Sequence, residues 1–297
     1  INYMKGIILA GGSGTRLYPL ALSVSKQLLP VYDKPMIYYP MSMLMLAGIK
    51  DILIISTPLD CNSFRRLFGN GNEFGLNIEY AIQEKPNGLP QAFIIGEKFI
   101  GNDSVCLVLG DNIFYGGGMR KRLQTAKANA EHGKATIFGY FVPDPNRFGI
   151  AEFDNNFKVL SIEEKPINPK SQYAITGMYF LDNRAIQYAK NCKPSNRGET
   201  EILDVIQQYL NVDNLSIDVL GRGFSWFDCG THDSLADATD FVRMVETHQG
   251  IQLSCLEEIS YINGWISKEQ LSNRAKLMGK STYGAHLRNV LEGKIIH

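Results

Sequence analysis

The sequence lacks the features of several other classes of protein. It has 30 Lys and Arg residues and 30 Asp and Glu residues, so its formal net charge is zero. The charge balance therefore does not favour binding to nucleic acid or to a membrane surface. No apolar run approaches the ~20 residues that a membrane-spanning helix needs. The first residues, INYMKGII, lead directly into an apolar strand pattern, so we expect no signal peptide. The remaining composition, with 44% hydrophobic and 20% charged residues, is typical of a soluble globular protein.

Cysteines are few and widely spaced. The five cysteines stand at positions 61, 106, 192, 229 and 255, without the close spacing of a metal-binding motif. An odd and scattered set favours a reducing compartment over a disulfide framework. We therefore expect a cytoplasmic protein.

A glycine-rich segment is present, but the two commonest phosphate-binding motifs are not. The apolar run at 6–10 is followed by glycines at positions 11, 12 and 14. No Gly-Lys-Ser/Thr follows, which excludes a Walker A loop, and Leu17 stands where a dinucleotide fingerprint needs its third glycine. Because glycines let backbone N–H groups approach an anion, and Arg16 and Lys26 add two cations, these residues still predict a phosphate or nucleotide site. The residues alone leave its type open.

Strand and helix patterns alternate through the first half of the chain. Buried-strand patterns at 6–10, 51–56, 77–81 and 105–109 alternate with helix patterns at 36–48, 63–68, 91–99 and 119–132. This predicts an α/β fold, Rossmann-like, with a mixed, mostly parallel sheet covered by helices. The second half has shorter strand patterns, and residues 268–291 indicate two more helices. We expect one compact unit over 4–248, with halves of about 4–134 and 135–248, and a helical region over 249–297.

Polar residues stand where two of the predicted strands end. The glycine segment follows the first strand, and Asp111 follows the strand at 105–109. Ligands of parallel sheets bind off the C-terminal ends of the strands, so we expect these two features to converge. A single aspartate in such a position more often caps a turn than holds a metal, and Asp111 by itself does not decide between the two.

The segment LAGGSGTRLYP, followed by SKQLLPVYDKP, closely resembles the signature of the sugar-1-phosphate nucleotidylyltransferase family. Its continuation, MIYYPMSMLMLAGIKDILIIS, looks most like the glucose-1-phosphate thymidylyltransferases of that family, and the resemblance runs almost to the C-terminus. It implies an enzyme that transfers a thymidylyl group from dTTP to glucose-1-phosphate, giving dTDP-glucose and pyrophosphate. The expected cofactor is Mg²⁺, and the expected pathway is deoxysugar (dTDP-rhamnose-type) and cell-surface polysaccharide synthesis. Residues 4–134 would then be the nucleotide half and 135–248 the smaller, sugar-binding half.

The resemblance also assigns roles to individual residues. Asp111 and Asp228 are expected to hold Mg²⁺, since a hard divalent cation prefers oxygen ligands. Asp111, Arg16, Lys26 and Lys165 are the expected catalytic residues. Nucleotide contacts are implied for Gly11, Gly12, Gly14, Thr15, Arg16, Gln27, Gln83, Gly88 and Asp111, and sugar-phosphate contacts for Gly149, Glu164, Lys165, Arg197 and Trp226. Gln83 would read the base, because an amide can both donate to and accept from a pyrimidine edge.

Two residues depart from the family pattern. Phe148 stands where relatives commonly have Tyr, so a hydroxyl contact is lost, and Leu203 stands where they commonly have a Thr that faces the sugar. Thr200 could partly compensate for the second change. The preference for one sugar-1-phosphate is therefore less well defined by the sequence than the preference for a pyrimidine nucleotide.

The resemblance further implies a homotetramer inhibited by a downstream deoxysugar nucleotide such as dTDP-rhamnose. The regulatory site is expected near Tyr115-Gly116 and residues 254–259, although Gly117 stands where relatives often have histidine. Two alternatives stay open. One is a UTP-dependent uridylyltransferase, because thymine and uracil differ by one methyl group, worth only ~1–3 kcal/mol in a pocket. The other is a non-catalytic nucleotide-sugar sensor. Binding of nucleic acid or a membrane is not expected.

Overall fold

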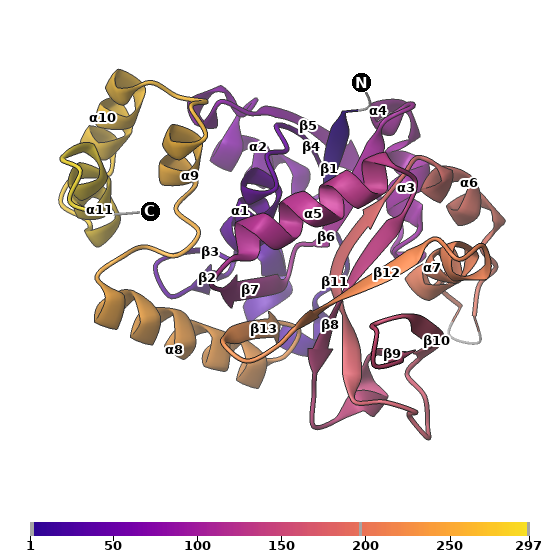
Figure 1. The fold of residues 1–297 in the computed structure, drawn as a ribbon. Helices are drawn as coiled ribbons and strands as arrows, with labels where there is room; N and C mark the ends of the chain where they lie inside the picture. The colour runs from indigo at the N-terminus through magenta and orange to yellow at the C-terminus, as the bar shows by residue number, and fades with distance from the viewer. Residues whose placement is uncertain (1–2, 196–197, 296–297) are drawn as a thin grey trace.

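The computed structural model describes residues 3–195 and 198–295, and Figure 1 shows a central sheet with helices on both faces. Nine strands form this sheet: β1 (Met4–Ala10), β4 (Asp51–Ser56), β5 (Asn77–Ile82), β6 (Ser104–Leu109), β8 (Ala135–Phe141), β9 (Gly149–Phe153), β10 (Val159–Glu164), β11 (Tyr173–Leu181) and β12 (Leu215–Leu220). The main strand order is β10-β9-β11-β6-β1-β4-β5, with β8 joined to β11 and β12. Strands β6, β1, β4 and β5 pair in parallel, whereas β11 is antiparallel to β6, β8 and β9.

The apolar runs of the sequence form the two-sided core of this sheet. Along β1, Ile8 and Ala10 pack into one hydrophobic cluster, and Ile7 and Leu9 pack into another on the opposite face. This alternation follows from the pleat of a strand, which turns successive side chains to opposite faces. The first cluster includes residues of α1 (Tyr38–Leu46), α2 (Cys61–Phe68) and α5 (Met119–Glu131), and the second includes residues of α3 (Gln91–Ile95), α6 (Arg184–Asn191) and α7 (Ile202–Asn211).

A short antiparallel ribbon lies beside the large sheet and was not predicted. Strand β7 (Asn112–Gly116) pairs with β13 (Phe224–Asp228), and Asn112 is the register partner of Asp228. The ribbon brings together two segments that lie far apart in the chain, because β7 follows β6 directly whereas β13 follows β12. It brings Asp111, which directly precedes β7, close to Asp228, the last residue of β13.

The C-terminal helices extend the molecule to one side (Figure 1). Helix α8 (His232–Gln249) ends at Gly250, and α9 (Leu256–Ile262), α10 (Lys268–Leu277) and α11 (Thr282–Leu291) follow it. Helices α10 and α11 pack around a hydrophobic cluster of their own that includes Leu271, Tyr283 and Leu287. A hairpin of β2 (Pro30–Val31) and β3 (Lys34–Pro35), helix α4 (Glu97–Ile100) and five short 3-10 helices complete the elements of the described residues.

The predicted α/β fold, with its mixed sheet and helical C-terminal region, is confirmed. The helix expected over 91–99 is divided at Gly96 into α3 and α4, and α9 lies within the helical region expected over 249–297 but was not predicted as a separate helix. The division of the chain into 4–134, 135–248 and 249–297 stays a prediction. Within the described ranges, no helix has the length and apolar character needed to cross a membrane.

Candidate active site

One cavity of about 430 Å³ collects most of the residues singled out from the sequence. It opens beyond the ends of β1 and β6, where the parallel strands finish, and the β7–β13 ribbon forms part of its wall. The predicted residues that line it are Gly11, Gly12, Arg16, Lys26, Gln27, Gln83, Gly88, Asp111, Glu164, Lys165, Trp226 and Asp228. The expected convergence of the glycine segment and Asp111 is therefore observed.

The glycine segment and Arg16 form one end of the cavity. Arg16 lies in a short 3-10 helix, residues Thr15–Leu17, that begins directly after the glycines. Its guanidinium packs against Gly230, where an added Cβ would lie 2.6 Å from Arg16 Nη2. A residue with a side chain at position 230 would therefore push Arg16 away from Asp228. This end of the cavity carries the exposed, planar cation that suits phosphate oxygens.

Lys26 and two carboxylates lie at the centre. Lys26 Nζ forms a close ion pair with Asp111 Oδ2. Burial raises the pKa of the Asp111 carboxyl, but the charge of Lys26 and the hydrogen bonds from Lys26 and Asn112 together outweigh burial and hold this pKa below its ordinary value. Burial likewise lowers the pKa of Lys26, and the charges of Asp111 and Asp228 reverse that effect and raise it. Both groups are therefore charged at neutral pH.

Asp228 has the opposite electrostatic character. Burial, together with the negative charge of Asp111, raises its pKa to about 6, although Lys26 and Arg16 act against this rise. Two carboxylates with incompletely offset repulsion form an oxygen donor set that a hard divalent cation would neutralise. The residues present thus fit a divalent metal ion held between Asp111 and Asp228.

Two amide side chains lie near the glycine segment. Gln83 is 5% exposed and Gln27 is 2% exposed, so both amides are buried and held in place. Ser25 Oγ donates to Gln27 Oε1 at 2.6 Å, and Gln83 Nε2 donates to Gln91 Oε1 at 2.7 Å. Gly88, with φ +116°, lies nearby on the cavity wall. This end of the cavity offers both hydrogen-bond donors and acceptors at fixed positions.

The other end carries Glu164 and Lys165. Lys165 Nζ lies 3.7 Å from Glu164 Oε1, and Lys165 has a left-handed backbone with φ 45°. This conformation is strained for a residue with a long side chain, and such strain occurs preferentially at functional sites. The backbone N–H of Lys165 donates to Phe148 O at 3.0 Å, which holds the turn in place. Phe148 and Trp226 also line this end, with ring centroids 5.3 Å apart.

Several predicted residues lie elsewhere. Gly14 and Thr15 flank the cavity without lining it, and Gly149 lies behind Glu164, where an added Cβ would come 3.3 Å from Glu164 Oε2. Arg197 lies outside the described residues. Leu203 is buried in the core against Gly149 and does not line the cavity. Thr200 does line it, and its hydroxyl donates to Asn87 O at 3.0 Å.

Asn112 is a site residue that the sequence reasoning missed. Its Nδ2 donates to Asp111 Oδ1 at 3.1 Å, and its Oδ1 accepts from Trp226 Nε1 at 2.7 Å and from the backbone N–H of Gly177 at 3.0 Å. Asn112 therefore joins the Asp111 carboxylate to the wall of the cavity that carries Trp226. Its position directly after Asp111 was the available signal.

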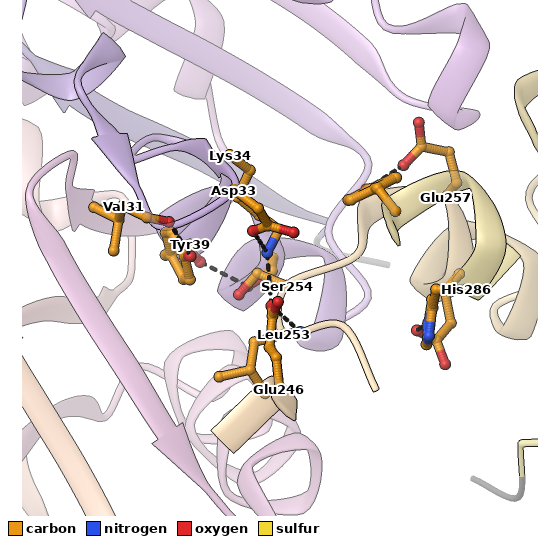
Figure 2. Close-up of polar contacts among 12 residues, drawn as sticks. Val31, Asp33, Lys34, Tyr39, Glu246, Leu253, Ser254, Glu257 and His286 are labelled. Atoms are coloured by element: carbon orange, nitrogen blue, oxygen red, sulfur yellow. Dashed lines mark hydrogen bonds and ion pairs between the residues drawn. The ribbon is translucent and has the colours of Figure 1, made fainter. Parts of the chain in front are cut away.

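A second cavity of about 310 Å³ lies at the far end of β7. Its lining is mostly apolar and comes from α1, β7, the start of α5, residues 252–255 and α9. It includes Tyr115, Gly116, Ser254 and Ile259, which belong to the segments expected to form a regulatory site. Figure 2 shows Leu253 and Ser254 beside a buried group of polar side chains that includes Lys34 and Glu246.

The match to a known family decides the class of this site. The family model described as "Nucleotidyl transferase" matches residues 5–244. The chain belongs to the nucleotidyl transferase family. It is 59% identical over 289 residues to the glucose-1-phosphate thymidylyltransferase of Neisseria meningitidis, a match that covers 97% of this chain and 100% of the relative. It is 53% identical to that of Xanthomonas campestris, with 99% of each chain covered.

Solved structures agree with this membership. A proposed glucose-1-phosphate thymidylyltransferase from Bacillus anthracis, solved in complex with sucrose, superposes with a TM-score of 0.75 at 41% identity. That match covers 81% of this chain and 96% of the other. A UDP-glucose pyrophosphorylase solved with UDP-glucose has a TM-score of 0.71 at 20% identity, which shows a common fold.

Proposed function

We propose that this member of the family transfers a thymidylyl group from dTTP to glucose-1-phosphate, forming dTDP-glucose and pyrophosphate. The observation that carries this proposal is a single cavity with phosphate-binding cations and two carboxylates at its centre. Buried amides lie at one end of it and the Glu164–Lys165 pair at the other. The thymidylyltransferase names of relatives more than 50% identical support dTTP and glucose-1-phosphate as the substrates.

In the proposed reaction a phosphate oxygen of glucose-1-phosphate attacks the α-phosphorus of dTTP. The new oxygen–phosphorus bond forms as the bond to the β-phosphate oxygen breaks, and pyrophosphate leaves in line. Arg16 and the backbone of Gly11 and Gly12 bind the triphosphate. Lys165 binds the attacking phosphate, and Glu164 accepts hydrogen bonds from the sugar hydroxyls. The protein acts mainly by positioning two anions and offsetting the charge that develops between them.

Lys26 and the two aspartates act at the reacting phosphate. Mg²⁺, when bound, would neutralise charge on the triphosphate, and Asp111 and Asp228 are the residues that would hold it. Lys26 is already charged beside Asp111 and offers its ammonium group to the same phosphate. Asn112 keeps the Asp111 carboxylate oriented through its 3.1 Å hydrogen bond.

A turnover assay tests this function. Purified protein with Mg²⁺ is supplied with dTTP, UTP, ATP or GTP, each combined with several sugar-1-phosphates, and pyrophosphate release is measured. We expect dTTP with glucose-1-phosphate to have the highest kcat/KM, UTP to be second and purine triphosphates to be poor substrates. A preference for UTP would instead identify a uridylyltransferase. Absence of turnover with every pair, together with retained nucleotide-sugar binding, would identify a sensor.

Assembly and regulation extend the proposal. The protein forms a homotetramer in the cytoplasm, and a downstream deoxysugar nucleotide such as dTDP-rhamnose inhibits it by binding the second cavity. Five free cysteines support a reducing compartment, and the lining by Tyr115, Ser254 and Ile259 supports the location of the regulatory site. Light scattering at micromolar concentration tests the assembly, and a monomer would contradict it. Inhibition by dTDP-rhamnose that is noncompetitive with dTTP tests the regulatory site.

A further inference from the structure

Gln91 contacts the base-reading end of the cavity without lining it. It is the first residue of α3 and acts on the cavity through Gln83, to which it is hydrogen-bonded. A role for Gln91 at this end of the cavity rests on the proposed function, in which Gln83 reads the base. Gln91 is not among the residues to which the sequence assigned a role.

The hydrogen bonds around Gln91 have a fixed direction. Gln91 Oε1 accepts from Gln83 Nε2 at 2.7 Å and from the backbone N–H of Asn87 at 3.4 Å. A backbone N–H can only donate, so it favours the oxygen of Gln91 on this side. Since an oxygen faces Gln83, the amide group of Gln83 must turn its nitrogen toward Gln91.

The oxygen of Gln83 therefore points the other way, toward Gly11. A Cβ added to Gly11 would lie 2.5 Å from Gln83 Oε1, and Gly11 lines the cavity. The backbone of Gly11 is not left-handed, so the proximity of this oxygen, and not an unusual φ, is what requires glycine there. Because Gln83 is only 5% exposed, its amide group is held in one position, and its hydrogen-bond partners decide which of its two ends faces Gln91.

We propose that Gln91 is a positioning residue that fixes the polarity of the Gln83 amide and so selects thymine or uracil over cytosine. With one N–H used by Gln91, Gln83 presents a carbonyl acceptor and its second N–H donor in one order. Thymine and uracil carry an N3–H donor beside a carbonyl, which matches that order. Cytosine carries an N3 acceptor beside an amino group, and it matches the reversed order.

Substitutions at position 91 test this role by changing only what faces Gln83. The measurement is kcat/KM for dTTP and for dCTP at saturating glucose-1-phosphate in the wild type, Gln91→Glu, Gln91→Met and Gln91→Lys. Glu keeps the acceptor and should retain the dTTP-to-dCTP ratio within about threefold. Met removes the acceptor and should lower the ratio about tenfold, the worth of roughly one hydrogen bond. Lys supplies a donor, should reverse the amide and should lower the ratio further.

The ratio separates this role from simple structural damage. Added charge near the triphosphate affects dTTP and dCTP alike and cancels in the ratio. The KM for glucose-1-phosphate and the thermal midpoint should stay near the wild-type values in all three variants. An unchanged ratio in Gln91→Met and Gln91→Lys would overturn the proposal, and so would an equal loss in Gln91→Glu and Gln91→Met.

Gln83→Ala distinguishes failure of this inference from failure of the proposed function. If Gln83→Ala removes the preference for dTTP while the Gln91 variants keep it, Gln83 reads the base without help from Gln91, and only this inference fails. If the wild type does not use dTTP, or if Gln83→Ala leaves the ranking of triphosphates unchanged, the base-reading role fails and this inference fails with it.

Discussion

Two lysine–carboxylate pairs lie eight positions apart along the same segment of the chain, and they have different surroundings. Lys26 pairs with Asp111 on the wall of the first cavity, and Lys34 pairs with Glu246 at 2.8 Å beneath the second. The side chains of the first pair are 16% and 11% exposed, whereas those of the second are 2% and 3% exposed. The first pair can exchange partners with a ligand, and the second cannot.

The partners around each pair explain the difference. Lys34 also contacts Asp33 Oδ1 at 2.6 Å and lies over the ring of Tyr39, and Glu246 Oε1 accepts from the backbone N–H of Leu253 at 2.8 Å (Figure 2). These contacts join the β2–β3 hairpin to the segment after α8. A second carboxylate, Asp228, lies beside Lys26, and burial and the negative charge of Asp111 raise its pKa. The same kind of ion pair thus forms a structural link in one place and part of the proposed active site in the other.

The largest expected effect is a loss of stability on breaking the buried Lys34–Glu246 pair. Lys34→Met leaves Glu246 charged and buried without its partner, and it should lower the free energy of unfolding by about 3–5 kcal/mol. Activity per folded molecule should stay near wild type. Urea unfolding measures the change. The double variant Lys34→Met/Glu246→Met is the control and should recover most of the loss, because a buried apolar pair avoids the charge. A loss below 1 kcal/mol in the single variant would contradict a structural role.

The corresponding change at the Lys26–Asp111 pair should lower turnover. Lys26→Met removes the positive charge that would face the reacting phosphate, and it should lower kcat/KM by about 10²–10³-fold. With Mg²⁺ present the unfolding free energy should change much less than in Lys34→Met, because the cavity gives Asp111 access to water and to the cation. A steady-state assay and urea unfolding on the same preparation measure both. Turnover within threefold of wild type would show that Lys26 does not act at the reacting phosphate.

The contribution of Asp228 to stability should depend on pH, which adds a second difference between the two pairs. Its raised pKa of about 6 means that the metal-free protein gains stability as pH falls through 6 and loses it as pH rises. Asp228→Asn removes this charge and should stabilise the metal-free protein by about 1–3 kcal/mol at pH 8, and by less at pH 5, while abolishing most turnover. Unfolding in EDTA at both pH values measures the effect. Asp111→Asn is the control and should destabilise at pH 8, because Lys26 loses its partner.

The smallest expected effect is at Asp33. Asp33→Asn removes one of the two carboxylates beside Lys34, but its amide oxygen can still accept from Lys34 Nζ. The free energy of unfolding should fall by less than about 1 kcal/mol, which is typical of exchanging one partner while another remains. A loss as large as that of Lys34→Met would mean that Asp33, and not Glu246, is the main partner of Lys34.

Local patterns predicted much of the fold because they depend on neighbours in the chain. The strand expected at 51–56 has the same bounds in β4, and the helix expected at 119–132 ends one residue earlier in α5, since apolar runs and helical periodicity need no distant partner to be recognised. The β7–β13 ribbon was missed because each of its strands is five residues long and is stabilised by pairing with the other. The site was predicted as a set of residues mainly through the family motifs.

By itself, the sequence determined the glycine segment after β1, the cations at 16 and 26, and Asp111 at the end of β6. These features follow from residue type and position along one stretch of chain. Only the tertiary structure decided which residues meet around the cavity: Asp228 lies beside Asp111, Arg16 packs against Gly230, and Gln91 lies behind Gln83. It also decided that Lys34, eight positions beyond Lys26 in the same segment, is buried with Glu246. The strength of an ion pair and the direction of an amide depend on burial and on partners, and both are fixed only when distant segments pack together.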